Sequence, residues 1–235
     1  AAFEAGMDVV LANKGPVALA YADLQVLASR TGCMLRYEAT VMAGTPALAL
    51  AQEALAGSAI TRMRGILNGT TNYMLTQMEQ GRSYQDALRQ AQDLGYAEAD
   101  PTADVDGWDA AGKALILAAA IFGVNLTMSD LTVQGIRNLT TAEIQSAMKA
   151  GERYRLIAQV TPQGGSVSPL RLPASDPLAQ VAGATNAITV TSDLMQDVTL
   201  IGPGAGRTET GFALLADLLA IHRQRDRAGY NHDNR

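Results

Sequence analysis

Residues 95–119 read GYAEADPTADVDGWDAAGKALILAA, and this stretch decides how the fold of the chain is interpreted. Its second half predicts the strongest helix of the chain, from about Gly107 to Phe122. Asp109 and Lys113 are four residues apart on that helix, so their side chains lie on one face, one turn from each other. The stretch therefore places a carboxylate and an amine together near the start of a long helix.

Four more acidic residues crowd the loop that precedes this helix: Glu98, Asp100, Asp104 and Asp106. Capping a helix N-terminus requires fewer carboxylates than this. One interpretation is that the acids bind the ammonium group of an amino-acid substrate while Lys113 handles a proton. The other is an acidic first turn with a solvent-exposed Asp–Lys pair, worth about a few tenths of a kcal/mol. Composition alone favours the second interpretation, since charge clusters usually face solvent.

Three other segments carry residues that suit ligand binding. ANKGP, residues 12–16, follows a predicted buried strand, and a lysine at the carboxyl end of such a strand lies where α/β sheets bind ligands. The GPGAG loop, residues 202–206, precedes a predicted helix and permits close approach of a phosphate or a ring. LNGTTNY, residues 67–73, leads from a strand into a helix and suits an oxyanion or a carboxylate. A solvated lysine, a tight turn and a capped helix explain the three segments almost as well.

The rest of the pattern mixes strands and helices without strict alternation. Strands are predicted over residues 8–12, 34–41, 59–67, 154–161, 166–172, 187–191 and 197–201. Helices are predicted over residues 18–30, 47–55, 107–122, 141–150 and 208–222, with two more that end near Glu79 and Gly95. We infer an α/β (α+β) chain in which an incomplete Rossmann-type unit joins an α+β domain with a mixed sheet.

Composition narrows the class of function. The 235 residues carry 18 basic and 23 acidic side chains, and the net charge of −5 argues against a nucleic-acid-binding surface. Cys33 is the single cysteine, and His222 and His232 are the two histidines, so a disulfide, a cysteine-based zinc site and a histidine-based triad are not expected. The apolar run 114–124 is too short to span a bilayer, and no signal segment opens the chain. We therefore expect a cytoplasmic enzyme acting on a small molecule, with no nucleic-acid or membrane partner.

Five segments, taken together and in order, resemble the homoserine dehydrogenase family: VVLANKGPVAL, YEATVMAGTPAL, GILNGTTNYMLTQM, AQDLGYAEADPTADVDGWDAAGKALILA and GPGAGRTETGFALLADL. They span Val9 to Leu218, and the central block is long and highly specific. The resemblance implies an oxidoreductase that reduces L-aspartate 4-semialdehyde to L-homoserine with NADPH or NADH, on the route to threonine and methionine.

The same resemblance implies roles for individual residues. Lys113 is implied to be the proton donor and acceptor at the substrate oxygen, and Lys14 to lie beside the nicotinamide and the substrate. The implied substrate-binding residues are Glu98, Asp109, Asp104, Tyr96 and Thr70. The implied cofactor contacts are Lys14, Asn13, Gly95 and Gly206. A lysine ammonium beside the aldehyde oxygen would stabilise the growing negative charge and deliver a proton.

The resemblance further implies a monovalent-cation site and a homodimer. Glu38, with the carbonyls of Val41, Ala43 and Thr45, matches a site for Na⁺ or K⁺ in the family. Oxygen ligands of this kind suit a hard cation. The loop after Glu38 is richer in glycine in several family members, which makes this match weaker than that of the catalytic pair.

The chain departs from the family at its start, because the GxGxxG turn that receives the pyrophosphate is absent. We expect upstream residues to be missing and the chain as written to bind a dinucleotide poorly. The implied organisation is a remnant of the nucleotide-binding domain over 1–32 and a catalytic and dimerisation domain over 33–200. Residues 201–222 are implied to return to the first domain, and 223–235 form a polar tail predicted to fray. We expect no regulatory ACT domain, as in the short form of the family.

Three alternatives stay open at this point. In the first alternative, the chain is an inactive remnant of the catalytic domain that serves binding or assembly. In the second, it is the C-terminal piece of a bifunctional aspartate kinase–homoserine dehydrogenase. The third alternative is a different oxidoreductase that acts on a related amino-acid aldehyde. Kinase-like sequence upstream would reveal the second, and an assay that compares aldehydes would settle the third.

Overall fold

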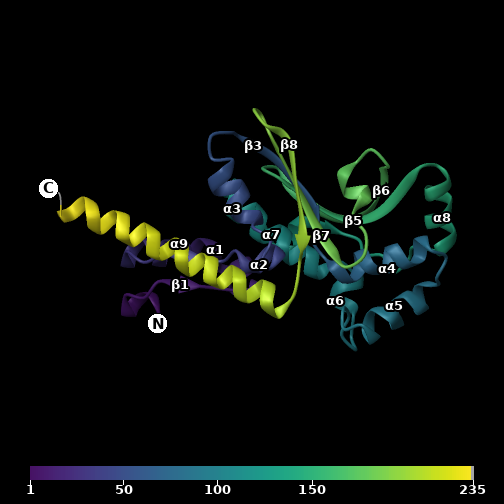
Figure 1. The fold of residues 1–235 in the computed structure, drawn as a ribbon, viewed down its shortest axis with the longest axis horizontal. Coiled ribbons are helices and arrows are strands. Elements are labelled where there is room, and N and C mark those ends of the chain that lie inside the picture. Colours follow the sequence, from purple (N-terminus) through teal and green to yellow (C-terminus); the bar gives the residue numbers. More distant parts are fainter. Residues whose placement is uncertain (234–235) are drawn as a thin grey trace.

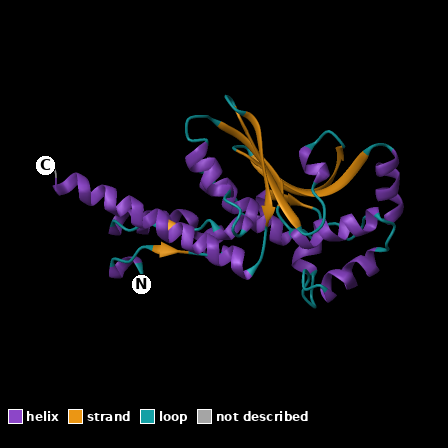
Figure 2. Ribbon diagram, in the orientation of Figure 1, coloured by secondary structure: helices purple, strands orange, loops and turns teal. Residues whose placement is uncertain are grey.

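The computed structural model describes residues 1–233, in which helices pack beside one large mixed sheet and one small parallel sheet (Figures 1 and 2). The predicted class, α/β with a mixed sheet, is confirmed. Among the helices described, none combines the length and the apolar character required to cross a bilayer.

The large sheet has six strands in the order β4-β6-β5-β3-β7-β8. The strands are β3 (Ile60–Ile66), β4 (Leu131–Val133), β5 (Glu152–Thr161), β6 (Gly164–Pro173), β7 (Thr185–Ser192) and β8 (Gln196–Pro203). Neighbours pair antiparallel except β4, which runs parallel to β6. The hairpin predicted at residues 162–165 is confirmed, since Thr161 pairs with Gly164 across a two-residue turn. Strand β4 was not predicted, because three residues carry too little periodicity to stand out.

Helices lie on one side of this sheet (Figure 2). They are α4 (Gly69–Glu79), α5 (Tyr84–Asp93), α6 (Thr102–Val105), α7 (Trp108–Phe122) and α8 (Thr141–Lys149). Of these, α4, α7 and α8 pack on its strands, and α5 and α6 pack on α4 and α7. Helix α7 lies at the centre of the core, where its buried alanines, including Ala111, Ala114 and Ala118, permit close packing. A smaller cluster on the other face packs under the short helix η4 (Pro177–Gln180). The core thus forms around α7.

The small sheet pairs β1 (Val9–Val10) in parallel with β2 (Leu35–Arg36), and α1 (Lys14–Thr31) connects the two. The C-terminal helix α9 (Arg207–Asp233) returns to this unit and lies beside β1 (Figure 1). Arg225 of α9 donates to the Asp8 carboxylate at 2.6 Å, which ties the two ends of the chain together. The domain boundaries at residues 32 and 200 remain predictions.

Three predicted boundaries were wrong. The strand predicted over 34–41 is short, because the chain turns after β2 and residues 39–42 form the helical turn α2 (Ala39–Met42). The Glu38 carboxylate holds this turn by accepting the N–H groups of Leu48 and Ala49, at the start of α3 (Ala47–Ala49) and the π-helical turn η2 (Leu50–Ala54). Helix α1 begins at Lys14, four residues before the predicted start at residue 18, because the Asn13 side chain caps it by accepting the N–H of Gly15.

The predicted polar tail is the third correction. Helix α9 continues through residues 223–233, where we predicted frayed chain, and residues 234–235 of that tail lie outside the described residues. The Arg225–Asp8 pair gives this extension a partner on the small sheet.

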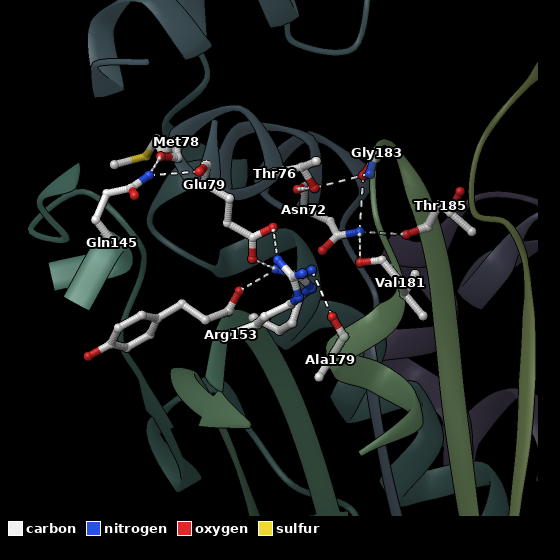
Figure 3. Close-up of polar contacts among 12 residues, drawn as sticks. Asn72, Thr76, Met78, Glu79, Gln145, Arg153, Ala179, Val181, Gly183 and Thr185 are labelled. Atoms are coloured by element: carbon white, nitrogen blue, oxygen red, sulfur yellow. Dashed lines mark hydrogen bonds and ion pairs between the residues drawn. The ribbon is translucent and has the colours of Figure 1, made fainter. Parts of the chain in front are cut away.

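A buried ion pair anchors the C-terminal end of α4 (Figure 3). Glu79 accepts from Arg155 at 2.6 Å and from Arg153 at 2.9 Å, both on β5. Arg155 is 1% exposed and also donates to the carbonyl of Ala179 in η4 at 2.8 Å. The carboxylate therefore joins a helix, the sheet and the turn on the far face.

Replacing this carboxylate should destabilise the protein strongly. Glu79→Gln leaves the Arg155 charge buried without its counter-ion, so we expect the free energy of unfolding to fall by ~3–5 kcal/mol. Glu53→Gln is the control, because its pair with Arg36 is exposed and worth about 1 kcal/mol or less. Denaturant titration measures both variants, and equal losses would contradict a special role for Glu79.

Candidate active site

Lys113 is a buried lysine that points from α7 toward the start of α4. Its ammonium donates to the carbonyl of Leu67 at 2.6 Å and lies 2.9 Å from Asp109 Oδ2. Only 8% of the residue is exposed, so the alternative of a solvated Asp–Lys pair is wrong. An ammonium removed from water in this way is stable only where it is paired and hydrogen-bonded, and here Asp109 supplies the counter-charge and Leu67 the hydrogen-bond acceptor.

Lys14 reaches the same carboxylate from the small sheet. It is the first residue of α1, and its ammonium contacts Asp109 Oδ1. The side chain of Lys14 is 40% exposed, whereas that of Lys113 is 10% exposed. One carboxylate thus bridges a buried lysine and an accessible one, and Lys14 marks the open side of the cluster.

Asn68 completes the cluster and was not predicted as a site residue. It caps α4 by accepting the N–H of Thr71 at 2.9 Å. Its amide donates to Asp104 at 2.7 Å and to Asp109 at 3.0 Å. The sequence LNGTTNY indicates the cap, but contacts between an amide and two acids 36 and 41 residues away depend on the fold.

The charges in the cluster shift one another's pKa values. Burial lowers the pKa of Lys113, and the neighbouring Lys14 adds to this, while the Asp109 carboxylate opposes it. Burial on its own raises the pKa of Asp109, but the charges of the two lysines and the hydrogen bonds from Lys14 and Asn68 outweigh it, so its pKa lies well below the usual range. Burial raises the pKa of Asp104. Asp109 therefore stays ionised beside a lysine that releases its proton more readily than usual.

Thr70 and Tyr96 meet at the rim of the cluster. The Thr70 hydroxyl donates to the Tyr96 carbonyl, and the Tyr96 ring lies 5.0 Å from the ring of Tyr73. The Tyr96 ring is largely open, with 46% of the residue exposed. Gly95 precedes it with φ +76°, the left-handed conformation that ends α5.

Glu98 is the predicted substrate ligand that does not join the cluster. Its side chain is exposed, and within the described part of the chain its carboxylate takes part in no hydrogen bond or ion pair. Only its carbonyl has a partner, the Gln92 amide, at 3.1 Å. Its substrate-binding role remains a prediction.

Gly206 lies at the start of α9 with φ +133°, where the Glu209 side chain folds back against it. The loop 202–206 runs beside the segment after α2, because the Thr45 hydroxyl donates to the carbonyl of Pro203 at 2.9 Å. The predicted cofactor loop and the predicted cation segment are therefore in contact.

Glu38 lies apart from the lysine cluster. Its N–H donates to Asp217 of α9 at 2.9 Å, and burial raises the pKa of its carboxyl to about 7. It lines a cavity of about 340 Å³ together with Tyr37 and Asp217, and none of the cluster residues lines that cavity. Val41 is buried, and Ala43 has φ +46°, an uncommon conformation for a residue with a side chain.

Comparisons with known proteins agree on one family. The sequence profile described as "Homoserine dehydrogenase" matches residues 46–219. The chain is 48% identical over 231 residues to an NAD(+)-dependent homoserine dehydrogenase of Pseudomonas canavaninivorans, which covers 96% of this chain and 66% of that protein. It is 44% identical to a homoserine dehydrogenase of Methanocaldococcus jannaschii, over 91% of this chain and 64% of the relative. The chain thus spans slightly less than two thirds of these relatives.

Solved structures give the same result. A homoserine dehydrogenase from Thiobacillus denitrificans superposes with a TM-score of 0.91 at 35% identity, covering 95% of this chain and 53% of that one. A hyperthermophilic archaeal homoserine dehydrogenase in complex with NADPH gives a TM-score of 0.85 at 34% identity, covering 94% and 66% of the two chains.

Removing the Asp109 charge should make Lys113 lose its proton at lower pH. The carboxylate opposes the effect of burial, so in Asp109→Asn we expect the pKa of Lys113 to fall further below that of a free lysine. NMR titration of lysine Cε measures the midpoint. Asp106→Asn is the control, since Asp106 pairs with Arg137 at 2.7 Å. An unchanged midpoint in Asp109→Asn would show that the carboxylate does not set the lysine's charge.

Proposed function

We propose, from the premise that this chain belongs to the homoserine dehydrogenase family, that it forms the catalytic part of an enzyme interconverting L-aspartate 4-semialdehyde and L-homoserine. NAD or NADP would be the cofactor, since one relative is NAD(+)-dependent and another was solved with NADPH. The observation that carries the proposal is the Asp109 carboxylate, which contacts a buried lysine on one side and an accessible lysine on the other.

The residues present fit a nicotinamide dinucleotide. Asn13 and Lys14 directly follow the carboxyl end of β1 in a parallel pair, which is where open α/β sheets bind such ligands. A Cβ at Gly95 would meet no atom within 4 Å, so its backbone is approachable, whereas Gly206, just before α9, becomes approachable when the Glu209 side chain turns away. These four residues would hold the cofactor, which when bound supplies the hydride for the aldehyde carbon.

Lys113 would serve the substrate oxygen. Negative charge grows on that oxygen as the aldehyde is reduced, and an ammonium held in a water-poor site stabilises it more than water does. The lowered pKa of Lys113 makes proton delivery to the oxygen easier, and Lys113 would take the proton back in the reverse direction. Asp109 keeps the amine in place and balances its charge.

The amino-acid end of the substrate carries an ammonium group and a carboxylate, and the site offers acidic side chains for the first and a helix N-terminus for the second. Asp104, held by Asn68, and the nearby Glu98 would bind the ammonium group. Thr70 lies in the first turn of α4, whose N–H groups and dipole favour a carboxylate. This division supports an α-amino acid as the substrate class.

Lys113→Met tests the proposal. The variant keeps the length and apolar stem of the side chain but has no proton and no charge to offer, so we expect kcat to fall by ~10²-fold or more. Cofactor oxidation with aspartate semialdehyde measures it, and Lys149→Met, at an exposed position of α8, is the control. Normal turnover in Lys113→Met would remove this residue from the mechanism. Both variants are made in the complete protein, with a GxGxxG segment ahead of residue 1, and no turnover in that protein would favour the binding or assembly role instead.

We also propose a monovalent cation at Glu38 and the carbonyls of Val41, Ala43 and Thr45. The donor set fits in chemistry: a buried carboxylate with a raised pKa gains from a nearby positive charge. The Thr45 carbonyl already accepts the Ala47 N–H at 2.8 Å, so it is the weakest member. We expect Na⁺ or K⁺ to stabilise the protein relative to choline, by ~2.7 kcal/mol at 100 times the Kd. A Glu38→Gln variant that keeps the full difference would contradict the site.

A homodimer is the assembly we propose. The edge strand β8 and the β7–β8 turn expose large apolar side chains, with Leu194 69%, Met195 57% and Ile201 53% exposed. Exposed apolar groups on an edge strand favour pairing with a second copy. Light scattering that gives a monomer mass for the full protein would overturn this.

A further inference from the structure

Asn186 is a buried asparagine whose side chain has no hydrogen-bond partner. It lies near the start of β7, is 1% exposed, and both atoms of its amide are unpaired within the described part of the chain. A buried polar group without a partner costs ~1–3 kcal/mol. Native proteins retain such groups rarely, so each one calls for an explanation.

The amide lies between two segments of the candidate active site. A Cβ at Gly204, in the GPGAG loop, would overlap the Asn186 amide group. A Cβ at Gly69, the first residue of α4, would lie 3.5 Å from Asn186 Oδ1. Asn186 therefore separates the predicted cofactor loop from the helix that Asn68 caps.

Position 204 requires glycine because a side chain would not fit there, and not because of its backbone conformation. Gly204 lies outside the left-handed region of φ, whereas Gly206 has φ +133°. An alanine at position 204 would therefore be unstrained but for the amide of Asn186. The loop and this side chain fit each other directly.

The start of β7 is held firmly, so the backbone that carries the Asn186 amide cannot move away from the loop. Asn72 of α4 donates to the carbonyls of Val181, Gly183 and Thr185 at 3.2, 3.0 and 3.1 Å (Figure 3). Asn186 follows Thr185 directly and pairs with Gly202 of β8. Its backbone is thus fixed, as are Gly202 and Pro203 of β8, so movement of residues 204–206, which follow that strand, is the easier way to give its amide a partner.

We propose that Asn186 is a positioning residue, whose amide binds the backbone of loop 202–206 when that loop closes on the cofactor. It thereby fixes Gly206 relative to the first turn of α4. The inference rests on the proposed function, because the loop must contact a nicotinamide dinucleotide. It also accounts for the unpaired amide, since a hydrogen bond made only in the closed loop adds to cofactor binding and not to stability.

Asn186→Leu separates this role from a structural one. Leucine keeps the volume and removes both unpaired atoms, so the melting temperature should stay the same or rise. Binding of NADH, followed by its fluorescence, should weaken by ~10-fold, the equivalent of one lost hydrogen bond. Asn72→Leu is the matched control, because it unpairs three carbonyls and should lower the melting temperature.

A double-mutant cycle tests the contact without any assay of activity. Gly204→Ala should lower the melting temperature by roughly 5 °C, as overpacking does. When Gly204→Ala is made together with Asn186→Ala, the shortened side chain leaves room for the new Cβ. Most of the loss in melting temperature caused by Gly204→Ala should then disappear. Independent effects of the two substitutions would show that the loop does not rest on this amide.

The outcomes are distinct. An Asn186→Leu variant that loses stability and binds NADH normally would make the amide structural and overturn the proposal. The complete protein, with a GxGxxG segment ahead of residue 1, is measured first: if it neither binds NADH nor reduces aspartate semialdehyde, the proposed function fails, and this inference fails with it. Unchanged stability with weakened NADH binding, together with a coupled cycle, supports the positioning role.

Discussion

The buried ammonium of Lys113 is the constraint on which the rest of the structure depends. A charge removed from water must have partners in fixed positions, and here they are the Leu67 carbonyl and the Asp109 carboxylate. Leu67 ends the central strand and Asp109 begins the central helix, so one amine fixes the register of sheet against helix. Lys14 then attaches the small parallel sheet to the same carboxylate. The site is where three elements of the fold meet.

Sequence patterns predicted those helices, helix ends and turns that depend on residues close together in the chain. The helix over 107–122, the helix end near Gly95 and the hairpin turn between the strands at 154–161 and 166–172 depend on neighbours in the chain, and each is present. The Asp109–Lys113 pair followed from helical spacing. Its burial did not follow, because a four-residue spacing is the same on an exposed helix and on a buried one.

Long-range contacts account for what the sequence did not predict. Thr40 and Val41 favour a strand, yet the Glu38 carboxylate turns the chain by binding N–H groups ten and eleven residues later. Asn68 is recognisable as a cap, but its bonds to Asp104 and Asp109 require the loop to fold back across the helix start. Glu98 lies in the same motif but has an exposed side chain outside the cluster, and its predicted contact with the substrate stays a prediction.

Two buried asparagines, Asn72 in α4 and Asn186 in β7, differ in how their side-chain amides are hydrogen-bonded. The Asn72 amide nitrogen donates to three carbonyls and fixes the loop before the strand, and only its oxygen has no partner among the described residues, whereas both amide atoms of Asn186, beside the GPGAG loop, have none. Stability alone would select against the second arrangement, because an apolar side chain of the same size would cost less. Groups that are costly in the folded chain are usually retained where a ligand or a closing loop uses them.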